Sequence, residues 1–363
     1  MAFTAAGAAA DFLEGATLMG RRWLARWPRW GRGLVLGLVA LILAPGVSGC
    51  QHSQSGQAVA EIRIGILNTP NDVAVARQLG YFQAAFPHQK LKFITFDSGV
   101  DANKALLSGG VDFATMGDTN GVVALAAEIP VQLCWINEIC GANEALVVRR
   151  SAKIKRVEDL VGRKIATPFA STSHYSLMSA LSQAGIRDQV TLLDMDTQNI
   201  VAAWQRGNID AAYTWQPTLA QLLPEATVLC DSADLAQQGI TTGNITLVRT
   251  QFAQAHPRLT QRFVATLDQA HQLRRRNFSQ AVSAAARQVG ISHREARLQM
   301  QGTTWPGASA EFSSAYLGAA GSSGAFVQAM TRTGQFMAGQ QTITTAPSEQ
   351  QFIDFIWKGD QEP

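Results

Sequence analysis

Near the middle of the chain stands the stretch Lys164-Ile165-Ala166-Thr167-Pro168-Phe169-Ala170-Ser171-Thr172-Ser173-His174-Tyr175-Ser176. Its first four residues form a short apolar run that predicts a strand, and apolar residues then recur at helical spacing from Leu177. Gly185 is placed to end this helix, because glycine commonly follows a helix in the left-handed conformation. The stretch therefore predicts a strand end, a hydroxyl-rich turn and a helix start in succession.

This turn has the properties of an anion site. The first turn of a helix has unpaired N–H groups and a partial positive charge, so a small anion is stabilised there. Ser171, Thr172 and Ser173 add hydroxyl donors without adding charge, and His174 and Tyr175 follow directly. We expect these residues to form one wall of a binding site for a small anion. The alternative is that Ser171 or Ser173 only caps the helix.

The composition is that of a folded protein large enough for two domains. The chain has 363 residues, of which 47% are hydrophobic and 16% are charged, which excludes a largely disordered protein. Residues 1–49 carry five arginines against one aspartate and one glutamate, which accounts for the whole formal net charge of +3. The remainder is electrically balanced and gives no indication of nucleic acid binding.

Residues 1–49 have the pattern of a targeting segment. A basic part is followed by an apolar core at Leu34–Leu43, which is too short to span a bilayer comfortably. Small residues then precede Cys50, as in a bacterial lipoprotein signal. We expect cleavage before Cys50 and lipidation of this cysteine, which would anchor the protein to a membrane outside the cytoplasm. An ordinary signal peptide with a chance cysteine is the alternative, and residues 50–60 would form a polar tether.

The remaining cysteines do not indicate a metal site. If Cys50 is lipidated, Cys134, Cys140 and Cys230 are left, and an odd number leaves at least one of them unpaired within the chain. The sequence contains no C-x-x-C motif and no histidine cluster. We therefore expect neither a metal nor another cofactor.

Strands and helices alternate through most of the chain. Five apolar runs between residues 61 and 149 predict strands separated by helical segments, and the pattern starts again at Ile154. This alternation predicts an α/β layered architecture. From residue 251 onward the pattern is mainly helical, with a loop rich in Gly, Ala and Ser expected at 307–324.

A short internal repeat supports a design of two similar lobes. Five residues recur at the same spacing, so that Ala105, Gly109, Val111, Asp112 and Ala114 correspond to Ala203, Gly207, Ile209, Asp210 and Ala212. Each copy predicts a helix that ends at glycine, then a strand, then a turn at Gly117–Asn120 or Trp215–Pro217. Ligands of open α/β sheets lie beyond the carboxyl ends of the strands, so both turns are expected to face a common cleft.

Several longer motifs carry a family resemblance. They are Phe96–Gly99, Asn143–Val148, Pro168–Leu177 and Ala202–Asp210. With these motifs, the segment from about residue 61 to residue 250 resembles the solute-binding component of taurine ABC importers. That component belongs to a wider family of binding proteins for aliphatic sulfonates, nitrate and thiamine precursors.

The resemblance implies a type II periplasmic binding protein fold, in which two α/β lobes close on a ligand about two hinge strands. Lobe 1 would hold residues 61–147 and 248–363, and lobe 2 residues 150–242. The two crossings would fall near Val147–Arg150 and Thr242–Leu247. The resemblance also implies an ABC permease and its ATPase as partners, a periplasmic or other extracytoplasmic location, and no enzymatic activity.

The ligand implied by the resemblance is taurine, a zwitterion with a sulfonate and an ammonium two carbons apart. The sulfonate needs donors near helix starts, for which the candidates are Ser98, Thr119, Ser171, Thr172 and Ser173, with His174 and Tyr175 beside them. The ammonium needs a carboxylate or an aromatic face, for which Glu144 and Trp215 are the candidates. Glu144 could instead brace the hinge, and Trp215 could belong to the core.

Two positions depart from the taurine pattern of the family. Family members that bind taurine have an aspartate in the returning hinge strand, where this chain has Asn244. The turn after the third strand has two serines in the family and Asp118-Thr119 here. A carboxylate at that helix start would repel a sulfonate if it faced the cleft. Asp118 could therefore cap its own helix or bind the cation in place of Asn244, or the ligand is not taurine.

The sequence thus predicts a lipid-anchored solute-binding protein for taurine or a related small solute that bears a sulfonate and an amine. The alternatives are a binding protein of the same fold for nitrate or a thiamine pyrimidine precursor, and a sensor or scaffold lipoprotein without a transport role. Enzymes are disfavoured. The cysteine-rich iron motif of thiamine-pyrimidine synthases is absent, and no G-x-S-x-G elbow is present for a serine hydrolase.

Overall fold

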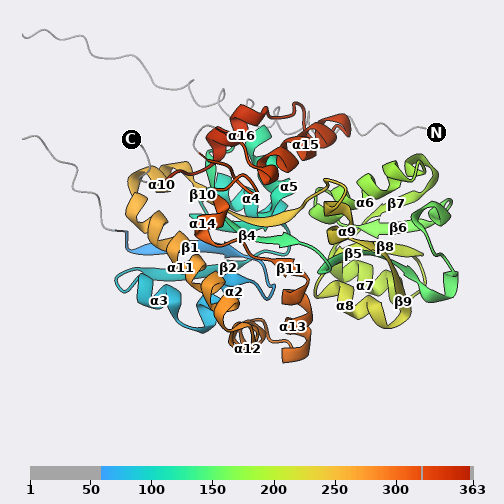
Figure 1. Ribbon diagram of the computed structural model, residues 1–363, viewed down its shortest axis with the longest axis horizontal. Coiled ribbons are helices and arrows are strands. Elements are labelled where there is room, and N and C mark those ends of the chain that lie inside the picture. Colours follow the sequence, from blue (N-terminus) through green and yellow to red (C-terminus); the bar gives the residue numbers. More distant parts are fainter. Residues whose placement is uncertain (1–58, 320–321, 360–363) are drawn as a thin grey trace, which may run out of the picture. The chain divides into compact units, whose positions relative to one another are not determined.

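Two β-sheets organise the chain in the computed structural model, which describes residues 59–319 and 322–359 (Figure 1). The first sheet has six strands in the order β11-β4-β10-β3-β1-β2, and the second has five in the order β7-β6-β8-β5-β9. Helices pack on both sheets (Figure 1), so the predicted α/β architecture is confirmed. The expected leader, Cys50 and most of the expected tether lie outside the described residues.

The first sheet combines parallel and antiparallel strands. Its strands are β1 (Glu61–Ile66), β2 (Lys90–Thr95), β3 (Phe113–Gly117), β4 (Val131–Cys140), β10 (Gly243–Arg249) and β11 (Thr303–Thr304). β1 is parallel to β2 and β3, whereas β10 is antiparallel to β3 and β4. In β1 the alternating Ile62, Ile64 and Ile66 are buried, as the sequence pattern predicted.

Helices cover both faces of the first sheet. They are α2 (Asp72–Gln78), α3 (Tyr81–Ala85), α4 (Gly99–Leu107), α5 (Asp118–Ala126), α10 (Thr250–Ala255), α11 (Pro257–Arg276), α12 (Phe278–Val289), α13 (His293–Gln301), α14 (Ala308–Glu311), α15 (Ala325–Gly339) and α16 (Glu349–Phe355). One apolar cluster joins β1 to α2, α11 and α12, and a second joins α5 to α15 and α16. The C-terminal third of the chain therefore completes the core of the first lobe.

The second sheet contains the start of the hydroxyl-rich stretch Lys164–Ser176. Its strands are β5 (Glu144–Arg149), β6 (Lys164–Thr167), β7 (Thr191–Asp194), β8 (Ala211–Trp215) and β9 (Ala226–Asp231), and its helices are α6 (Thr172–Gln183), α7 (Thr197–Gln205), α8 (Thr218–Leu222) and α9 (Ser232–Ala236). β6 runs directly into the turn before α6, and Gly185 follows the helix with a φ of 69°. The predicted succession of strand, turn and helix is confirmed.

The chain passes from one sheet to the other twice. β4 ends at Cys140 in the first sheet and β5 begins at Glu144 in the second, so this crossing is earlier than the expected Val147–Arg150. β5 belongs to the second sheet because it pairs with β8 on one side and β9 on the other. The chain has returned by Gly243, where β10 joins the first sheet.

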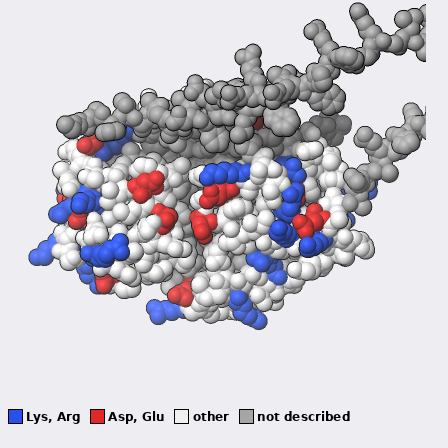
Figure 2. Space-filling view, turned by 180° about the vertical axis from the view of Figure 1, so that it is seen from behind, with Lys and Arg blue, Asp and Glu red and all other residues white. Residues whose placement is uncertain are grey.

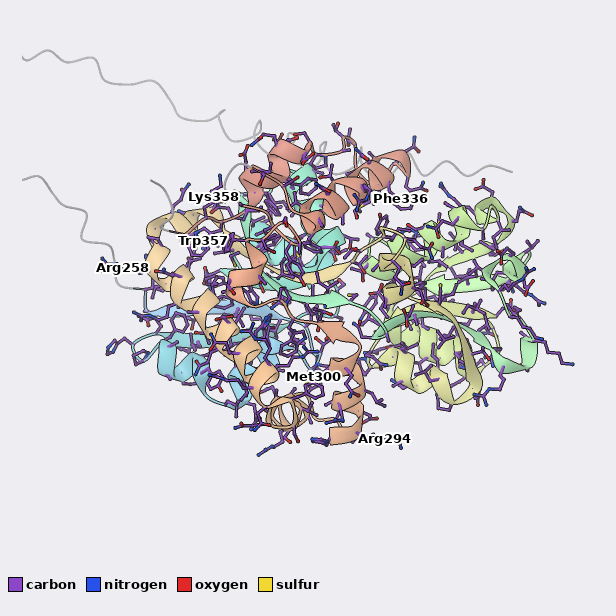
Figure 3. All side chains as sticks on the ribbon, viewed as in Figure 1. Arg258, Arg294, Met300, Phe336, Trp357 and Lys358 are labelled. Atoms are coloured by element: carbon purple, nitrogen blue, oxygen red, sulfur yellow. The ribbon has the colours of Figure 1, made fainter. Side chains whose placement is uncertain are left out.

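α15 adds a further contact between the lobes. Phe336, which is labelled on α15 in Figure 3, meets the ring of Tyr175 on α6, with ring centroids 5.1 Å apart. Arg332 of the same helix donates a hydrogen bond of 3.0 Å to the carbonyl oxygen of Gly239. The C-terminal region therefore packs against lobe 2 as well as completing lobe 1.

The internal repeat marks equivalent elements of the two lobes. The first copy forms the end of α4 and the start of β3, and the second forms the end of α7 and the start of β8. Gly109 and Gly207 follow their helices with φ values of 71° and 75°, a conformation that favours glycine. The two lobes therefore share one local design.

Some elements depend on tertiary contacts that the local pattern does not reveal. β11 has only two residues, which pair with the end of β4, and α14 lies inside the expected loop at 307–324. α5 begins at Asp118 instead of near Gly121, so the expected turn at Gly117–Asn120 is largely its first helical turn. Two strand residues are too few to produce a periodic signal.

A buried polar network connects α2, β4 and α11 beneath the first sheet. The completely buried carboxylate of Asp72 accepts hydrogen bonds from Trp135 Nε1 (2.7 Å) and Asn137 Nδ2 (2.9 Å). Nε2 of His271 lies 2.9 Å from the same carboxylate, and its Nδ1 lies 2.6 Å from the carbonyl oxygen of Pro306. Asp72 of α2 thus satisfies polar groups of both β4 and α11.

We predict that Asp72→Ala destabilises the protein by about 3 kcal/mol or more, because three buried partners lose their acceptor. Urea unfolding followed by circular dichroism measures this free energy. Glu61→Ala, which removes the exposed ion pair with Lys90, is the control and is expected to change stability little. Equal effects of the two substitutions would contradict the prediction.

Candidate functional site

A cavity of about 390 Å³ is lined by residues of both lobes. Its wall contains the ends of β3, β8 and β4 at Gly117, Trp215 and Glu138 to Cys140, and the start of β5 at Glu144. Both turns of the internal repeat contribute to it, which confirms that they face a common cleft. The volume is at the lower end of the range for small-molecule sites.

Four helices begin at this cavity, two from each lobe. The residues that precede them, Ser98 (α4), Gly117 (α5), Ser171 (α6) and Asp196 (α7), all line the wall. Each helix start directs a partial positive charge toward the cavity, which stabilises an anionic group. Of the four, α6 has no acidic residue at its cap or in its first turn, so its start attracts an anion most strongly.

The serine hydroxyls at these helix starts act as caps. Ser98 Oγ accepts from the backbone N–H of Asp101 at 3.3 Å and donates to the carboxylate of Asp101 at 3.1 Å. Ser171 Oγ accepts from the backbone N–H of His174 at 3.2 Å and donates to the carbonyl oxygen of Pro168 at 2.5 Å. The capping alternative for Ser171 is therefore supported, and backbone N–H groups are left as the donors for an anion.

Glu144 is tied to lobe 2 by three hydroxyl groups. It is 1% exposed and accepts hydrogen bonds from Thr172 (2.7 Å), Ser232 (3.3 Å) and Ser176 (3.4 Å). These bonds join the start of β5 to the first turns of α6 and α9. The arrangement supports the alternative in which Glu144 braces the hinge, and it also commits the hydroxyl proton of Thr172 to Glu144.

Trp215 lies beside Glu144 at the cavity wall. The two residues are directly opposite in the β5–β8 ladder, and Trp215 is only partly buried. Directly opposite residues of antiparallel strands share one face of the sheet. The aromatic ring is therefore at the cavity and not in the core of lobe 2.

Glu138 is a cavity residue that the sequence analysis missed. It is 5% exposed, lies near the end of β4 and accepts a hydrogen bond of 2.7 Å from Asn244 Nδ2. Glu138 and Asn244 are directly opposite in the β4–β10 ladder, and both line the wall. The available signal was the position of Glu138 near the end of one of the predicted strands.

Asp118 and Thr119 do not line the cavity. Asp118 is completely buried, and its Oδ1 accepts a hydrogen bond of 3.3 Å from the backbone N–H of Gly243 at the start of β10. Thr119 is also buried, because α5 begins at Asp118 and turns both side chains into the lobe. Asp118 therefore holds the returning strand, and the suggestion that it replaces the cation partner at Asn244 is not supported.

Three residues of the stretch 168–176 also lie away from the wall. Ser173 is completely buried, His174 stacks on Phe169 with ring centroids 4.3 Å apart, and Tyr175 packs on Phe336 of α15. Successive helical residues point about 100° apart, so a run of polar residues at a helix start cannot face one cavity. Of the stretch, Ser171 and Thr172 line the wall together with Pro168, Phe169 and Ala170.

The lobes touch across the cavity. Asn120 Nδ2 of α5 donates a hydrogen bond of 3.0 Å to the carbonyl oxygen of Ala170 in lobe 2. Gly117 lies so close to Thr172 that a Cβ atom there would be 3.0 Å from Thr172 Cγ2. These contacts bring the starts of α5 and α6 together at one side of the site.

The described wall is acidic. The acidic residues that line it are Asp97, Asp101, Glu138, Glu144 and Asp196, and among the described residues no lysine, arginine or histidine lines it.

The described part of the chain contains no group of three His, Cys, Asp or Glu residues suited to a metal ion. Within the same residues, no helix has the length and hydrophobicity needed to cross a bilayer. Cys134, Cys140 and Cys230 form no disulfide in the structure.

Burial perturbs the acids in and next to this wall. It raises the pKa of Glu138 to about 7, against the opposing effect of the hydrogen bond from Asn244. It also raises the pKa of Glu144 to about 7, although three hydroxyl groups stabilise the ionised form. Burial raises the pKa of Asp118 to about 7, with the Gly243 N–H opposing and the charge of Glu144 adding to the increase.

Comparison with solved structures identifies the class of fold. The periplasmic aliphatic sulphonate binding protein SsuA from Escherichia coli superposes with a TM-score of 0.68 at 23% identity, over 84% of this chain and 94% of that one. The alkanesulfonate-binding protein SsuA from Xanthomonas axonopodis pv. citri, bound to MOPS, superposes with a TM-score of 0.67 at 21% identity, over 82% of this chain and 98% of that one. The chain therefore has the two-lobed type II periplasmic binding protein fold.

The chain belongs to the family described as NMT1/THI5 like, which matches residues 71–280. The taurine-binding periplasmic protein of Escherichia coli (strain K12) is 39% identical over 178 residues. That match spans 49% of this chain and 55% of the relative, so it covers about half of each. The family resemblance found in the sequence is confirmed.

We predict that the ligand-free protein loses stability as pH rises from about 4.5 to about 7. The three acids retain protons in the folded state that their unfolded counterparts have released, so raising the pH across this window favours unfolding. The slope is up to about 1.4 kcal/mol per pH unit for each proton. Urea unfolding at several pH values measures it.

Glu138→Gln and Glu144→Gln are the matched variants, because each removes one titrating group from the wall. Each variant should show a shallower dependence of the unfolding free energy on pH than the original protein. Identical slopes in all three proteins would refute a role for these acids.

Proposed function

We propose that this protein is an extracytoplasmic solute-binding protein that captures taurine or a related small solute with a sulfonate and an amine. The observation that carries the proposal is the polarity of the cavity, where four helix starts meet a wall that contains buried carboxylates and, among the described residues, no basic side chain. Such a site suits a solute that brings its own positive charge. The names of the taurine-binding relative and of both SsuA proteins support a sulfonate as the negative end.

The positively charged end of the solute is expected to contribute more to affinity than any single helix start of the protein. A unit charge pair about 4 Å apart interacts with about 4 kcal/mol at an effective dielectric constant of 20, before desolvation is counted. One helix terminus contributes about 0.3–1 kcal/mol. A cation beside a wall carboxylate therefore outweighs one terminus, and the four termini together stabilise the sulfonate.

The acidic wall disfavours a simple anion such as nitrate. An anion without a positive group would enter a cavity lined by five acidic residues and would have only helix starts to bind it. The volume of about 390 Å³ leaves room for solutes larger than taurine. A thiamine pyrimidine precursor has the amine but no sulfonate, so it remains the second candidate within the fold.

Delivery to an ABC permease and its ATPase is part of the proposal, as is a lipid anchor at Cys50. The anchor rests on the apolar core at Leu34–Leu43 and the small residues before Cys50. No catalytic role is proposed. The taurine-binding relative is named as a binding protein, and burial raises the pKa of the Cys140 thiol, which leaves it a poor nucleophile.

Calorimetric titration of ligand-free protein tests the proposed function. Taurine is expected to bind at least about tenfold more tightly than ethanesulfonate, which has the same sulfonate and carbon chain but no amine. Nitrate is expected to give no heat. MOPS and a thiamine pyrimidine precursor complete the panel. No heat with taurine or MOPS, together with binding of nitrate or the pyrimidine, would reject the sulfonate assignment.

The lipid anchor is tested separately with Cys50→Ser. The original protein should be labelled by a radioactive fatty acid and recovered in the membrane fraction, because acyl chains on Cys50 partition into the bilayer. The variant should be unlabelled and leave the membrane fraction. Membrane recovery of both proteins in equal amounts would exclude Cys50 as the anchor.

A further inference from the structure

The acidic residues of the wall differ in how fully they are engaged. Glu144 accepts three hydroxyl hydrogen bonds within lobe 2. Asp196 caps α7 through the N–H groups of Asn199, and Asp101 is engaged by Ser98 and Lys104. Asp97 is exposed to solvent. Glu138 is buried to a similar extent as Glu144 but accepts one side-chain hydrogen bond, from Asn244. Glu138 therefore has acceptor capacity left on a buried carboxylate.

The single partner of Glu138 also orients it. Asn244 and Glu138 are directly opposite in the antiparallel β4–β10 ladder, so their side chains lie on one face of the sheet. The register of this ladder shifts between Asn244 and Ile245, a bulge of the kind that redirects side chains beside binding sites. The amide group of Asn244 thus fixes the carboxylate in a defined position at the cavity.

The pair presents two oxygen acceptors. When Glu138 is ionised, as it must be to bind a cation, its carboxylate can only accept, so the amide of Asn244 directs its Nδ2 toward Glu138 and its Oδ1 elsewhere. A carboxylate oxygen and an amide oxygen are then available side by side. An ammonium group has several N–H donors and matches this arrangement, whereas a sulfonate has none.

Within residues 59–319 and 322–359, no lysine, arginine or histidine side chain forms an ion pair with this carboxylate. The charge of Arg274 acts on Glu138, but its guanidinium donates to the carbonyl oxygens of Met300 and Thr303, each at 2.7 Å. The Arg274 guanidinium also lies over the ring of Trp305, 4.9 Å from its centroid. Trp305 donates its Nε1–H to Thr303 Oγ1 at 3.0 Å, and as a neutral donor it also opposes the increase in the pKa of Glu138. The described ion pairs of the structure do not include Glu138.

We infer that Glu138 is the residue that binds the positively charged nitrogen of the solute and selects amine-bearing solutes over simple anions, with Asn244 as its positioning partner. This inference rests on the proposed function and identifies which wall residue decides specificity. It assigns Glu144 to bracing the α6 start and not to the ligand. The selected class is a protonated primary amine separated from a sulfonate by a short chain.

The test compares taurine with ethanesulfonate by calorimetry in four proteins. They are the original chain, Glu138→Gln, the exchange variant Glu138→Gln with Asn244→Asp, and the control Glu158→Gln on the surface of lobe 2. Glu138→Gln keeps the shape of the side chain and removes its charge. The exchange variant moves the carboxylate to the opposite position of the same ladder and lets the new glutamine donate to it.

Glu138→Gln is expected to weaken taurine binding about tenfold or more, as for loss of a hydrogen bond to a charged group, and to leave ethanesulfonate binding unchanged or stronger. The exchange variant should recover taurine binding to within about fivefold of the original chain, a rescue that a purely structural defect would not show. Glu158→Gln should match the original chain for both solutes. Thermal unfolding of each variant verifies that it is folded.

The outcomes separate this inference from the proposed function. An original chain that binds neither taurine nor another amine-bearing sulfonate rejects the proposed function and this inference with it. An original chain that binds taurine while Glu138→Gln binds it equally well rejects the role of Glu138 alone. Equal weakening of taurine and ethanesulfonate by Glu138→Gln also rejects selectivity by this residue. An exchange variant that binds no better than Glu138→Gln rejects Asn244 as the positioning partner.

Discussion

The cost of burying a carboxylate governs the site of this protein. Glu138 near the end of β4 and Glu144 at the start of β5 lie on either side of the segment that passes between the sheets. A buried carboxylate must gain a proton, hydrogen bonds or a cation. Glu144 meets this requirement within lobe 2 through three hydroxyl groups, whereas Glu138 has one amide partner. Two similar acids close in sequence are therefore engaged differently: Glu144 is held by hydroxyl groups of lobe 2, whereas Glu138 keeps acceptor capacity, which is why we propose it for recognition of the solute.

The fold supplies the opposite polarity. In α/β lobes each strand leads at its carboxyl end to a helix start, and α4, α5, α6 and α7 all begin at the cavity for this reason. Their partial positive charges face the same space as the Glu138–Asn244 pair. The cavity therefore combines partial positive charges at the helix starts with a negative carboxylate at Glu138. This polarity is the basis on which we propose a dipolar solute instead of one that carries a single charge.

Local patterns predicted most of the scaffold and about half of the site. Periodicity located α6, α12 and, apart from the two-residue β11, the strands of both sheets, because their signals extend over several residues. Six of the residues predicted for the site line the cavity, namely Ser98, Glu144, Ser171, Thr172, Trp215 and Asn244. The other five do not line it, because a helix turns neighbouring side chains in different directions and buries some of them. These five are Asp118, Thr119, Ser173, His174 and Tyr175. Of the hydroxyl groups expected to bind an anion, those of Ser98 and Ser171 cap helices and that of Thr172 donates to Glu144.

The sequence by itself determined the two-lobed α/β design, through the alternating pattern, the internal repeat and the hydroxyl-rich turn before α6. These features are local, so their meaning does not depend on distant residues. Only the tertiary structure reveals the Glu138–Asn244 pair, at which we propose that the positive end of the solute binds. Glu138 and Asn244 are 106 positions apart, and only the antiparallel pairing of β4 with β10 brings them together. Hydrogen bonding between such distant residues leaves no periodic signal, because it depends on how the sheet is assembled.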